Sequence, residues 1–300
     1  SQLAKLVVPT LTGFEKDGSF VNQNFRLQRF KQAVPGPKSL MSEIVFLPKL
    51  IAQLQGDVHA VSPDMRQLWQ HIAQETDVIE EAVSWHTLPD EGLASLDGDT
   101  WLCPDSLKAV ERAVGAGLLA VDEVLADNLD AAFCSVRPPG HHATRSVSSG
   151  FCVYNNLAIA VRYAQSKDVK RIAIVDFDVH HGNGTQDIFM DDDSVLFCSL
   201  FQYPFYPNTA IENNATLVNS PLPIASDGND LKALYNQQWL PKLSVFKPDL
   251  IFISAGFDAH LEDDMASLKF VEEDYIWLTE QLASMSKTLN CKGIISFLEG

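Results

Sequence analysis

The chain has 300 residues, of which 46% are hydrophobic, and it carries a formal net charge of −17 at pH 7. Such a length and apolar content suffice for one large α/β domain with a buried core. The acidic charge argues against direct nucleic-acid binding, which depends on lysine and arginine at the phosphates, and it favours basic partners.

The cysteines and the apolar runs indicate the cellular compartment of the protein. Five cysteines lie far apart without a C-x-x-C pair, which argues against a disulfide framework and a thiolate zinc cage. No apolar run approaches the roughly 18 to 20 residues that a membrane span needs, and the first ten residues are too short for a secretory signal. We expect a protein of the reducing cell interior, cytoplasmic by default or nuclear, without membrane contact.

Short apolar runs alternate with longer helical patterns, which is typical of an α/β fold. In chain order, apolar spacing predicts helices over 24–34, 63–79, 106–125, 155–165, 230–245 and 272–288. Near-continuous apolar runs predict strands over 131–136, 171–177, 194–200, 250–254 and 292–298. The expected architecture is a central parallel β-sheet flanked by helices.

Polar clusters follow three of the predicted strands. His141 and His142 come after the strand over 131–136, Asp178 and His180 after 171–177, and Asp258 after 250–254. Ligands bind outside the carboxyl ends of the strands in an open parallel sheet. We therefore expect the three clusters to meet at one site.

The spacing of Asp178 and His180 predicts a metal site. Side chains two residues apart on an extended segment point to the same side and can hold one ion, with Asp258 as the third ligand. One imidazole and two carboxylates leave a position open for water, as in catalytic sites. Ligand hardness alone leaves Zn²⁺, Fe²⁺ and Mn²⁺ open.

His141 and His142 follow a Pro-Pro-Gly segment that restricts the backbone and then permits a turn. Two successive histidines opposite a metal site suggest a general base and a general acid for amide hydrolysis, in which metal-bound water attacks. Asp176 and Asn183 are the expected partners that set their tautomers. The chain lacks the phosphate-loop, G-x-S-x-G and H-E-x-x-H patterns of other hydrolases.

From Leu96 to its end, the chain resembles the zinc-dependent histone deacetylases. The resemblance is to the class II branch, with its bacterial histone deacetylase-like amidohydrolases and acetylpolyamine amidohydrolases. It rests on the segments 137–142 (RPPGHH), 150–152 (GFC), 175–186 (VDFDVHHGNGTQ), 254–260 (SAGFDAH) and 298–300 (LEG).

The resemblance implies an arginase-like fold and zinc-dependent hydrolysis of acetyl-lysine in proteins, histone tails among them. It assigns Asp178, His180 and Asp258 to zinc, and it makes His141 the general base with His142 beside it. It also implies a potassium ion held by Asp176, Ser199 and Leu200 together with the backbone of Asp178 and His180. The substrate-binding residues that it implies are Gly150, Phe151 and Tyr206 along the acyl-lysine tunnel, and Asp97 or Asp99 at the rim.

Three departures from the family pattern bear on function. The family's catalytic tyrosine follows Leu-Glu-Gly-Gly and this sequence ends at Gly300, so we expect residues 1–300 to be one deacetylase-like catalytic domain cut just before its C-terminal end. Phe201 replaces a usual histidine, and Asn208 and Ala210 replace glycines, which predicts a reshaped loop. The first 95 residues match the family only loosely.

Other functions remain open. An acetylpolyamine is an alternative substrate, and a zinc-binding pseudoenzyme that binds acylated partners without cleavage is an alternative role. An arginase-like ureohydrolase with two manganese ions is disfavoured, because His181 and Gly182 stand where that chemistry needs a further carboxylate.

Overall fold

The computed structural model describes residues 18–21, 27–30, 92–209 and 212–300. Contacts divide the chain into two compact units, Ser1–His71 and Ile72–Gly300. The prediction of a single domain over 1–300 stays a prediction.

In the first unit, β1 (Gly18–Val21) pairs antiparallel with β2 (Leu27–Phe30). The helix predicted over 24–34 is therefore wrong at Leu27–Phe30, because hydrogen bonding to a neighbouring strand outweighs a helix-like apolar spacing. The helix predicted over 63–79 lies outside the described residues.

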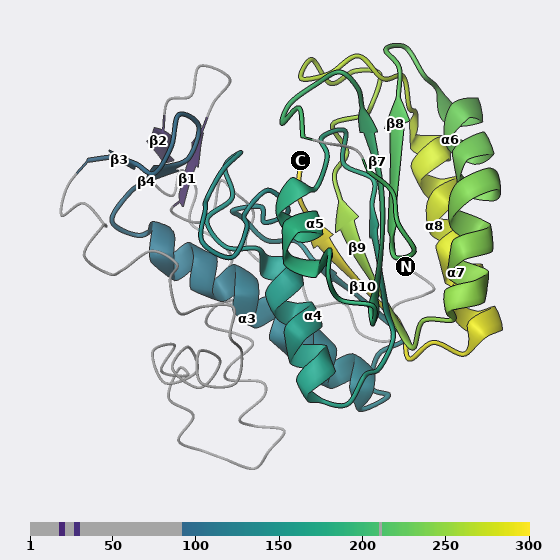
Figure 1. Ribbon diagram of the computed structural model, residues 1–300. Coiled ribbons are helices and arrows are strands. Elements are labelled where there is room, and N and C mark those ends of the chain that lie inside the picture. Colours follow the sequence, from purple (N-terminus) through teal and green to yellow (C-terminus); the bar gives the residue numbers. More distant parts are fainter. Residues whose placement is uncertain (1–17, 22–26, 31–91, 210–211) are drawn as a thin grey trace, which may run out of the picture. The chain divides into compact units, whose positions relative to one another are not determined.

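A six-stranded parallel sheet forms the centre of the second unit (Figure 1). In spatial order its strands are β5 (Ala131–Cys134), β10 (Ile294–Leu298), β9 (Leu250–Ala255), β6 (Ile172–Asp176), β7 (Val195–Gln202) and β8 (Leu217–Leu222). Every neighbouring pair is parallel. Five of these strands were predicted, and β8 was not, because Asn219, Ser220 and Pro221 interrupt its apolar run.

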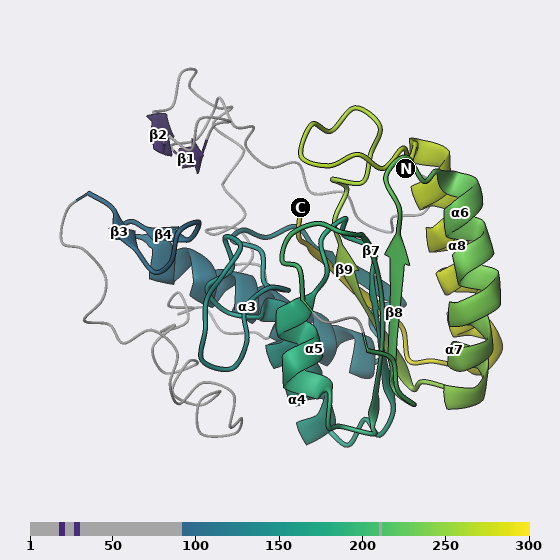
Figure 2. The same cartoon turned by 45° about the horizontal axis from the view of Figure 1, so that its top comes forward.

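Helices cover both faces of the sheet, and the turned view in Figure 2 shows the same two layers. One face carries α3 (Ser106–Leu125), α4 (Asn156–Ser166) and α5 (Asn183–Phe189). The other carries α6 (Gly228–Leu234), the π-helical turn η2 (Tyr235–Trp239), α7 (Leu240–Phe246) and α8 (Glu272–Leu289). The prediction of one helix over 230–245 thus corresponds to three consecutive helical segments.

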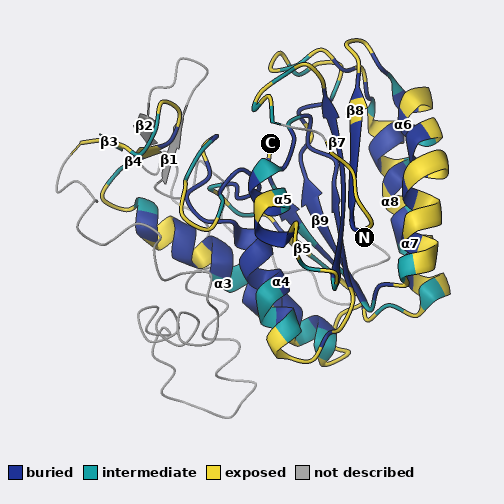
Figure 3. Ribbon diagram, viewed as in Figure 1, coloured by how far each residue is buried: buried dark blue, intermediate teal, exposed yellow. Residues whose placement is uncertain are grey.

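Successive side chains of β6 point to opposite faces of the sheet, so both faces need a covering layer of helices. Ala173 and Val175 pack toward α6, α7 and α8, whereas Ile172 and Ile174 pack toward α3 and α4. All residues of β6, β7 and β9 are buried, while the helices bury only their inward sides (Figure 3). The predicted parallel sheet with two covered faces is confirmed.

Two smaller features complete the second unit. The strands β3 (Ala94–Ser95) and β4 (Trp101–Leu102) form a short antiparallel pair just before α3. All five cysteines are free thiols. Among the residues that the structure describes, none of the helices combines the length and apolarity that a membrane crossing requires.

Gly117 marks a close approach of α3 to the sheet. A Cβ atom at this position would overlap the buried ring of Phe297 in β10 and lie 3.2 Å from Ala160 in α4. We expect Gly117→Ala to lower the free energy of unfolding by about 1–3 kcal/mol, the usual cost of overpacking, although alanine favours a helix by up to about 1 kcal/mol. Urea denaturation measures this change.

Gly98→Ala is the matched control, because a Cβ atom there meets open space. Equal stability of the Gly117 and Gly98 variants would contradict the proposed packing of α3 on β10.

Candidate active site

The loops that follow β5, β6 and β9 meet at one edge of the sheet. Among the described residues, one group of acidic and histidine side chains is arranged to hold a metal ion, namely Asp178, His180 and Asp258. One ligand atom of each lies within 4.8 Å of the others. The loops after β6 and β9 supply these ligands because the two strands are direct neighbours in the sheet.

Backbone groups fix the geometry of the three side chains. The Nδ1 atom of His180 lies 3.1 Å from Oδ1 of Asp178 and 3.0 Å from Oδ2 of Asp258. The amide of Gly300 donates to Oδ2 of Asp178 at 2.9 Å, and the amide of Val179 donates to Oδ1 of Asp258 at 2.9 Å. Both carboxylates are thereby held against the same imidazole nitrogen.

The electrostatics of this cluster fit a bound divalent cation. Burial opposes the charged form of His180, yet hydrogen bonds to Asp178 and Asp258 raise its pKa to about 9. Burial and the neighbouring charge of Asp178 raise the pKa of Asp258 to about 6. Two buried carboxylates in contact repel each other unless a cation lies between them. One imidazole nitrogen and two carboxylates are the donor set of a catalytic zinc site.

Glycines allow the strand ends to approach the ligands. A Cβ atom at Gly256 would overlap the carboxylate of Asp178, and one at Gly300 would lie 2.5 Å from Oδ2 of Asp258. These two positions explain in steric terms why glycine follows β9 and β10 at this edge of the sheet.

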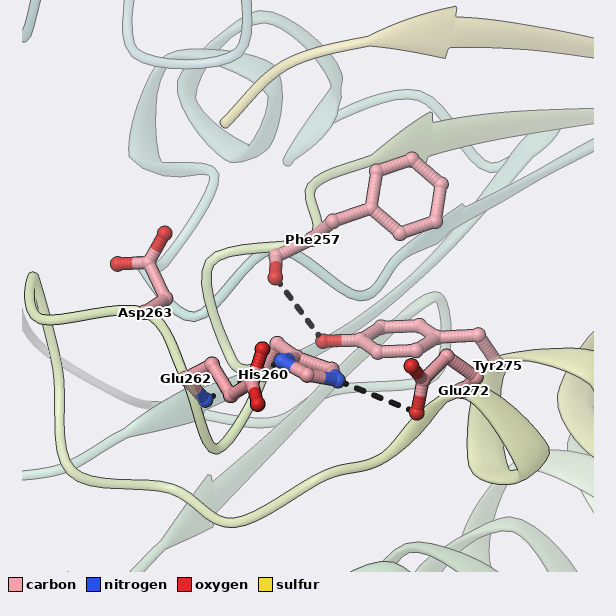
Figure 4. A pocket seen from close by; sticks show the side chains of 6 residues that line it. All are labelled: Phe257, His260, Glu262, Asp263, Glu272 and Tyr275. Atoms are coloured by element: carbon pink, nitrogen blue, oxygen red, sulfur yellow. Dashed lines mark hydrogen bonds and ion pairs between the residues drawn. The ribbon is translucent and has the colours of Figure 1, made fainter.

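The loop that carries Asp258 is also tied to α8 (Figure 4). The hydroxyl of Tyr275 donates to the backbone carbonyl of Phe257 at 3.2 Å, and Nε2 of His260 lies 3.4 Å from a carboxylate oxygen of Glu272. These residues line a surface hollow of about 480 Å³. Asp258 is thus held from the side of α8 as well as from β6.

His141 and His142 lie buried beside the metal ligands, with ring centroids 4.1 Å apart. Nδ1 of His141 lies 3.0 Å from Oδ2 of Asp176, and Nδ1 of His142 lies 2.7 Å from Oδ1 of Asn183. The structure therefore brings each histidine together with its expected partner. One partner is a carboxylate and the other a neutral amide.

This difference in partners sets different charge states. Burial acts to lower the pKa of His141, but the carboxylates of Asp178 and Asp176 raise it well above its usual value. Burial, opposed by His141, raises the pKa of Asp176 to about 7. Burial and the charge of His141 lower the pKa of His142 well below its usual value. His142 is neutral, and with Nδ1–H donating to Asn183 its Nε2 is the unprotonated nitrogen.

Glu299 supports the histidine loop, a role that the sequence did not reveal. Its Oε2 accepts hydrogen bonds from the amides of Gly140 at 2.6 Å and His141 at 3.1 Å. Its Oε1 accepts from the hydroxyl of Ser254 at 3.3 Å, and Arg137 donates to its backbone carbonyl. The sequence signal for this role was a carboxylate placed directly after the apolar run of β10.

The residues expected to hold potassium lie next to the metal ligands. Asp176 of β6 is in register with Ser199 of β7, and both are fully buried. Oδ1 of Asp176 accepts from the amide of Asp178 at 3.1 Å, and Leu200 follows Ser199 in β7. A potassium ion at this place stays a prediction.

Two aromatic rings of the loop after β7 cover the histidines. The Phe205 ring stacks on His180 with centroids 5.2 Å apart, and the Tyr206 ring meets His142 edge-on at 5.2 Å. The family resemblance placed Tyr206 at the tunnel wall. For Phe205 the sequence left a core position and a channel position equally open.

Phe151 is 39% exposed and has a positive φ of 68°, directly after Gly150 with a φ of 53°. A Cβ atom at Gly150 would overlap the His142 ring. Glycine is therefore required where this loop crosses the His142 ring, and it leads into an exposed aromatic side chain.

Asp97 and Asp99 lie in the turn between β3 and β4. Oδ1 of Asp97 accepts from the amides of Asp99 at 2.8 Å and Thr100 at 2.6 Å, so this carboxylate stabilises its own turn. Burial is the main cause of the raised pKa of Tyr206, and the charges of Asp99 and Asp97 add to it. The exposed carboxylate of Asp99 is the freer of the two for a substrate.

Metal binding at this site displaces a proton from His180, because the pKa of its metal-free imidazole is about 9. Affinity for Zn²⁺ is therefore expected to rise roughly tenfold per pH unit from pH 7 to 9 and then to level off. Below pH 6 the dependence steepens, since Asp258 with a pKa of about 6 is also protonated. Competition with a chromophoric chelator measures the affinity.

The Asp178→Asn variant is the control for this titration and should lose tight zinc binding. An affinity that does not change between pH 7 and 9 would contradict zinc ligation by His180.

Comparisons with known proteins agree with this geometry. The histone deacetylase domain model matches residues 54–300. The type-2 histone deacetylase 2 of Dictyostelium discoideum is 42% identical in an alignment 224 residues long that covers 67% of this chain and 13% of that protein. Histone deacetylase 14, chloroplastic, of Arabidopsis thaliana is 37% identical in an alignment 226 residues long that covers 70% of this chain and 53% of that protein.

The crystal structure of the HDA15 HD domain superposes with a TM-score of 0.64 at 33% identity, covering 69% of this chain and 60% of that one. This chain therefore spans only part of the length of these relatives. The arginase-like α/β fold expected from the sequence is confirmed, and the chain belongs to the histone deacetylase domain family.

Proposed function

We propose that the protein hydrolyses the acetyl amide of lysine side chains in proteins, histone tails among them, with Zn²⁺ held by Asp178, His180 and Asp258. The observation that carries this proposal is the buried triad of one imidazole and two carboxylates beside two histidines with different partners. Fe²⁺ satisfies the same donor set and is the alternative metal.

The bound ion would supply a Lewis acid that polarises the amide carbonyl and acidifies water. His142 is suited to accept the proton of the attacking water, because its neutral ring donates Nδ1–H to Asn183 and leaves Nε2 free. His141, whose Nδ1 faces the carboxyl group of Asp176, is suited to stabilise negative charge and to donate a proton to the leaving amine. The family resemblance assigns the base to His141, whereas these hydrogen bonds favour His142.

Side chains at the rim of the site suggest how a substrate would be held. Phe151 and Tyr206 offer apolar walls for the methylene groups of lysine, and the Asp99 carboxylate offers an acceptor for the substrate's backbone N–H groups. The net charge of −17 attracts lysine-rich tails over long range. A potassium ion at Asp176, Ser199 and Leu200 would brace the strand that presents Asp178.

Replacement of the base is the direct test. We expect His142→Gln to lower kcat on an acetyl-lysine peptide by about 10²–10⁴-fold, the usual contribution of a general base, while bound zinc stays at the wild-type level. Acetate release measures turnover, and elemental analysis measures the metal. Lys170→Gln, an exposed change at the opposite end of β6, should leave both unchanged.

A panel of acetyl-lysine peptides and acetylpolyamines separates the substrate classes. Faster turnover of acetylpolyamines would overturn the protein-lysine proposal. Wild-type protein that binds zinc and acylated peptides yet releases no acetate would instead establish the pseudoenzyme role.

A further inference from the structure

The aromatic segment 203–209 lies over the catalytic groups but has few ties to the sheet. Its first amide, that of Tyr203, donates to the Leu222 carbonyl at 2.9 Å, and the amide of Asn208 donates to Phe205 within the segment at 2.8 Å. Most of its side chains are exposed or half-buried. Within it, Phe205 packs against the hydrophobic core and the Tyr206 hydroxyl is hydrogen-bonded to Ser149, so the contact at its far end acts together with these two.

The far end is held by His181, which directly follows a metal ligand and is buried. Its Nδ1 lies 2.6 Å from the hydroxyl oxygen of Thr209. Its Nε2 lies 3.1 Å from Oε1 of Gln186 and 3.0 Å from Oδ1 of Asn219. One imidazole thus connects the metal-binding loop, α5, β8 and the aromatic segment.

The hydrogen-bond network determines the direction of each bond. The side-chain nitrogen of Asn219 donates to Oε1 of Gln186 at 2.6 Å and to the Glu212 carbonyl at 3.1 Å, so its oxygen faces His181. Two oxygen acceptors around Nε2 require that this nitrogen carries the proton. In the neutral ring Nδ1 is then unprotonated, and the Thr209 hydroxyl donates to it.

Two further contacts make this anchor rigid. Asn213 accepts from the amide of Asn219 at 2.6 Å and donates to the Asn219 carbonyl at 3.2 Å, which fixes that residue on β8. The buried Phe201 ring packs on His181 with centroids 4.5 Å apart. Phe201 is also a departure from the family pattern, so this support is a property of the present chain.

We propose that the Thr209–His181 hydrogen bond is a positioning contact that holds the Tyr206 wall against His142 and so strengthens binding of the acetyl-lysine side chain. The proposal rests on the proposed deacylase function. Thr209 and His181 act as positioning residues, through Tyr206 and Phe205, and neither takes part in proton transfer.

Thr209→Val tests the contact, because it removes the donating hydroxyl and keeps the size and branching of the side chain. We expect KM for an acetyl-lysine peptide to rise about five-fold with kcat nearly unchanged, which is the loss of one hydrogen bond. The value of kcat/KM for the same peptide should therefore fall by a similar factor. Thr209→Ser keeps the donor and should restore both values.

Hydrogen exchange of the amides in 203–209, measured on zinc-loaded protein without substrate, is the second readout. Thr209→Val should exchange about five-fold faster there and at the wild-type rate in β6. Thr288→Val is the matched control, because it removes a hydroxyl that donates to Ser284 on the exposed side of α8. It should change neither kinetics nor exchange in the segment.

The outcomes separate this inference from the proposed function. An unchanged KM and unchanged exchange in Thr209→Val would overturn the inference and leave the deacylase proposal intact. Wild-type protein without activity on any acyl peptide would overturn the deacylase proposal and the claim about substrate binding, while the exchange data would still decide whether Thr209 anchors the segment.

Discussion

Two carboxylates, from Asp178 and Asp258, are buried against one imidazole nitrogen, and the rest of the site depends on this burial. Paired buried acids are unfavourable without a compensating cation. The fold resolves this by presenting both on neighbouring parallel strands, β6 and β9, with backbone amides donating to their remaining oxygens. A divalent ion would complete the charge balance, which is why we place metal binding ahead of every other property in the proposed function.

The burial of these two carboxylates also constrains the side chains around the proposed metal site. The carboxyl group of Asp176 lies next to His141, and the neutral amide of Asn183 lies next to His142, and the pKa values of these two adjacent histidines shift in opposite directions. Glu299 reaches from β10 to fix the histidine loop, and Tyr275 reaches from α8 to fix the Asp258 loop. Contacts from four separate parts of the chain thereby hold the side chains of His141, His142 and Asp258 in place.

Much of the sheet was predictable because burial on both faces leaves a continuous apolar run, as in β6 and β9. The grouping of Asp178, His180 and Asp258 was predictable because their spacing and their place after strand ends are local features. Strand β8 was not, since its polar residues are satisfied by partners such as His181 and Asn213, which are distant or in loops. The support given by Glu299 was hidden for the same reason, because its partner His141 lies 158 residues away.

The central claim is that one imidazole and two carboxylates bind the catalytic metal. X-ray absorption at the zinc edge of the loaded protein tests it most directly. The account predicts only nitrogen and oxygen neighbours at about 2.0–2.2 Å, including the outer-shell signature of one imidazole. Sulfur scattering at about 2.3 Å, or zinc retained with the same spectrum in Asp178→Asn, would contradict it.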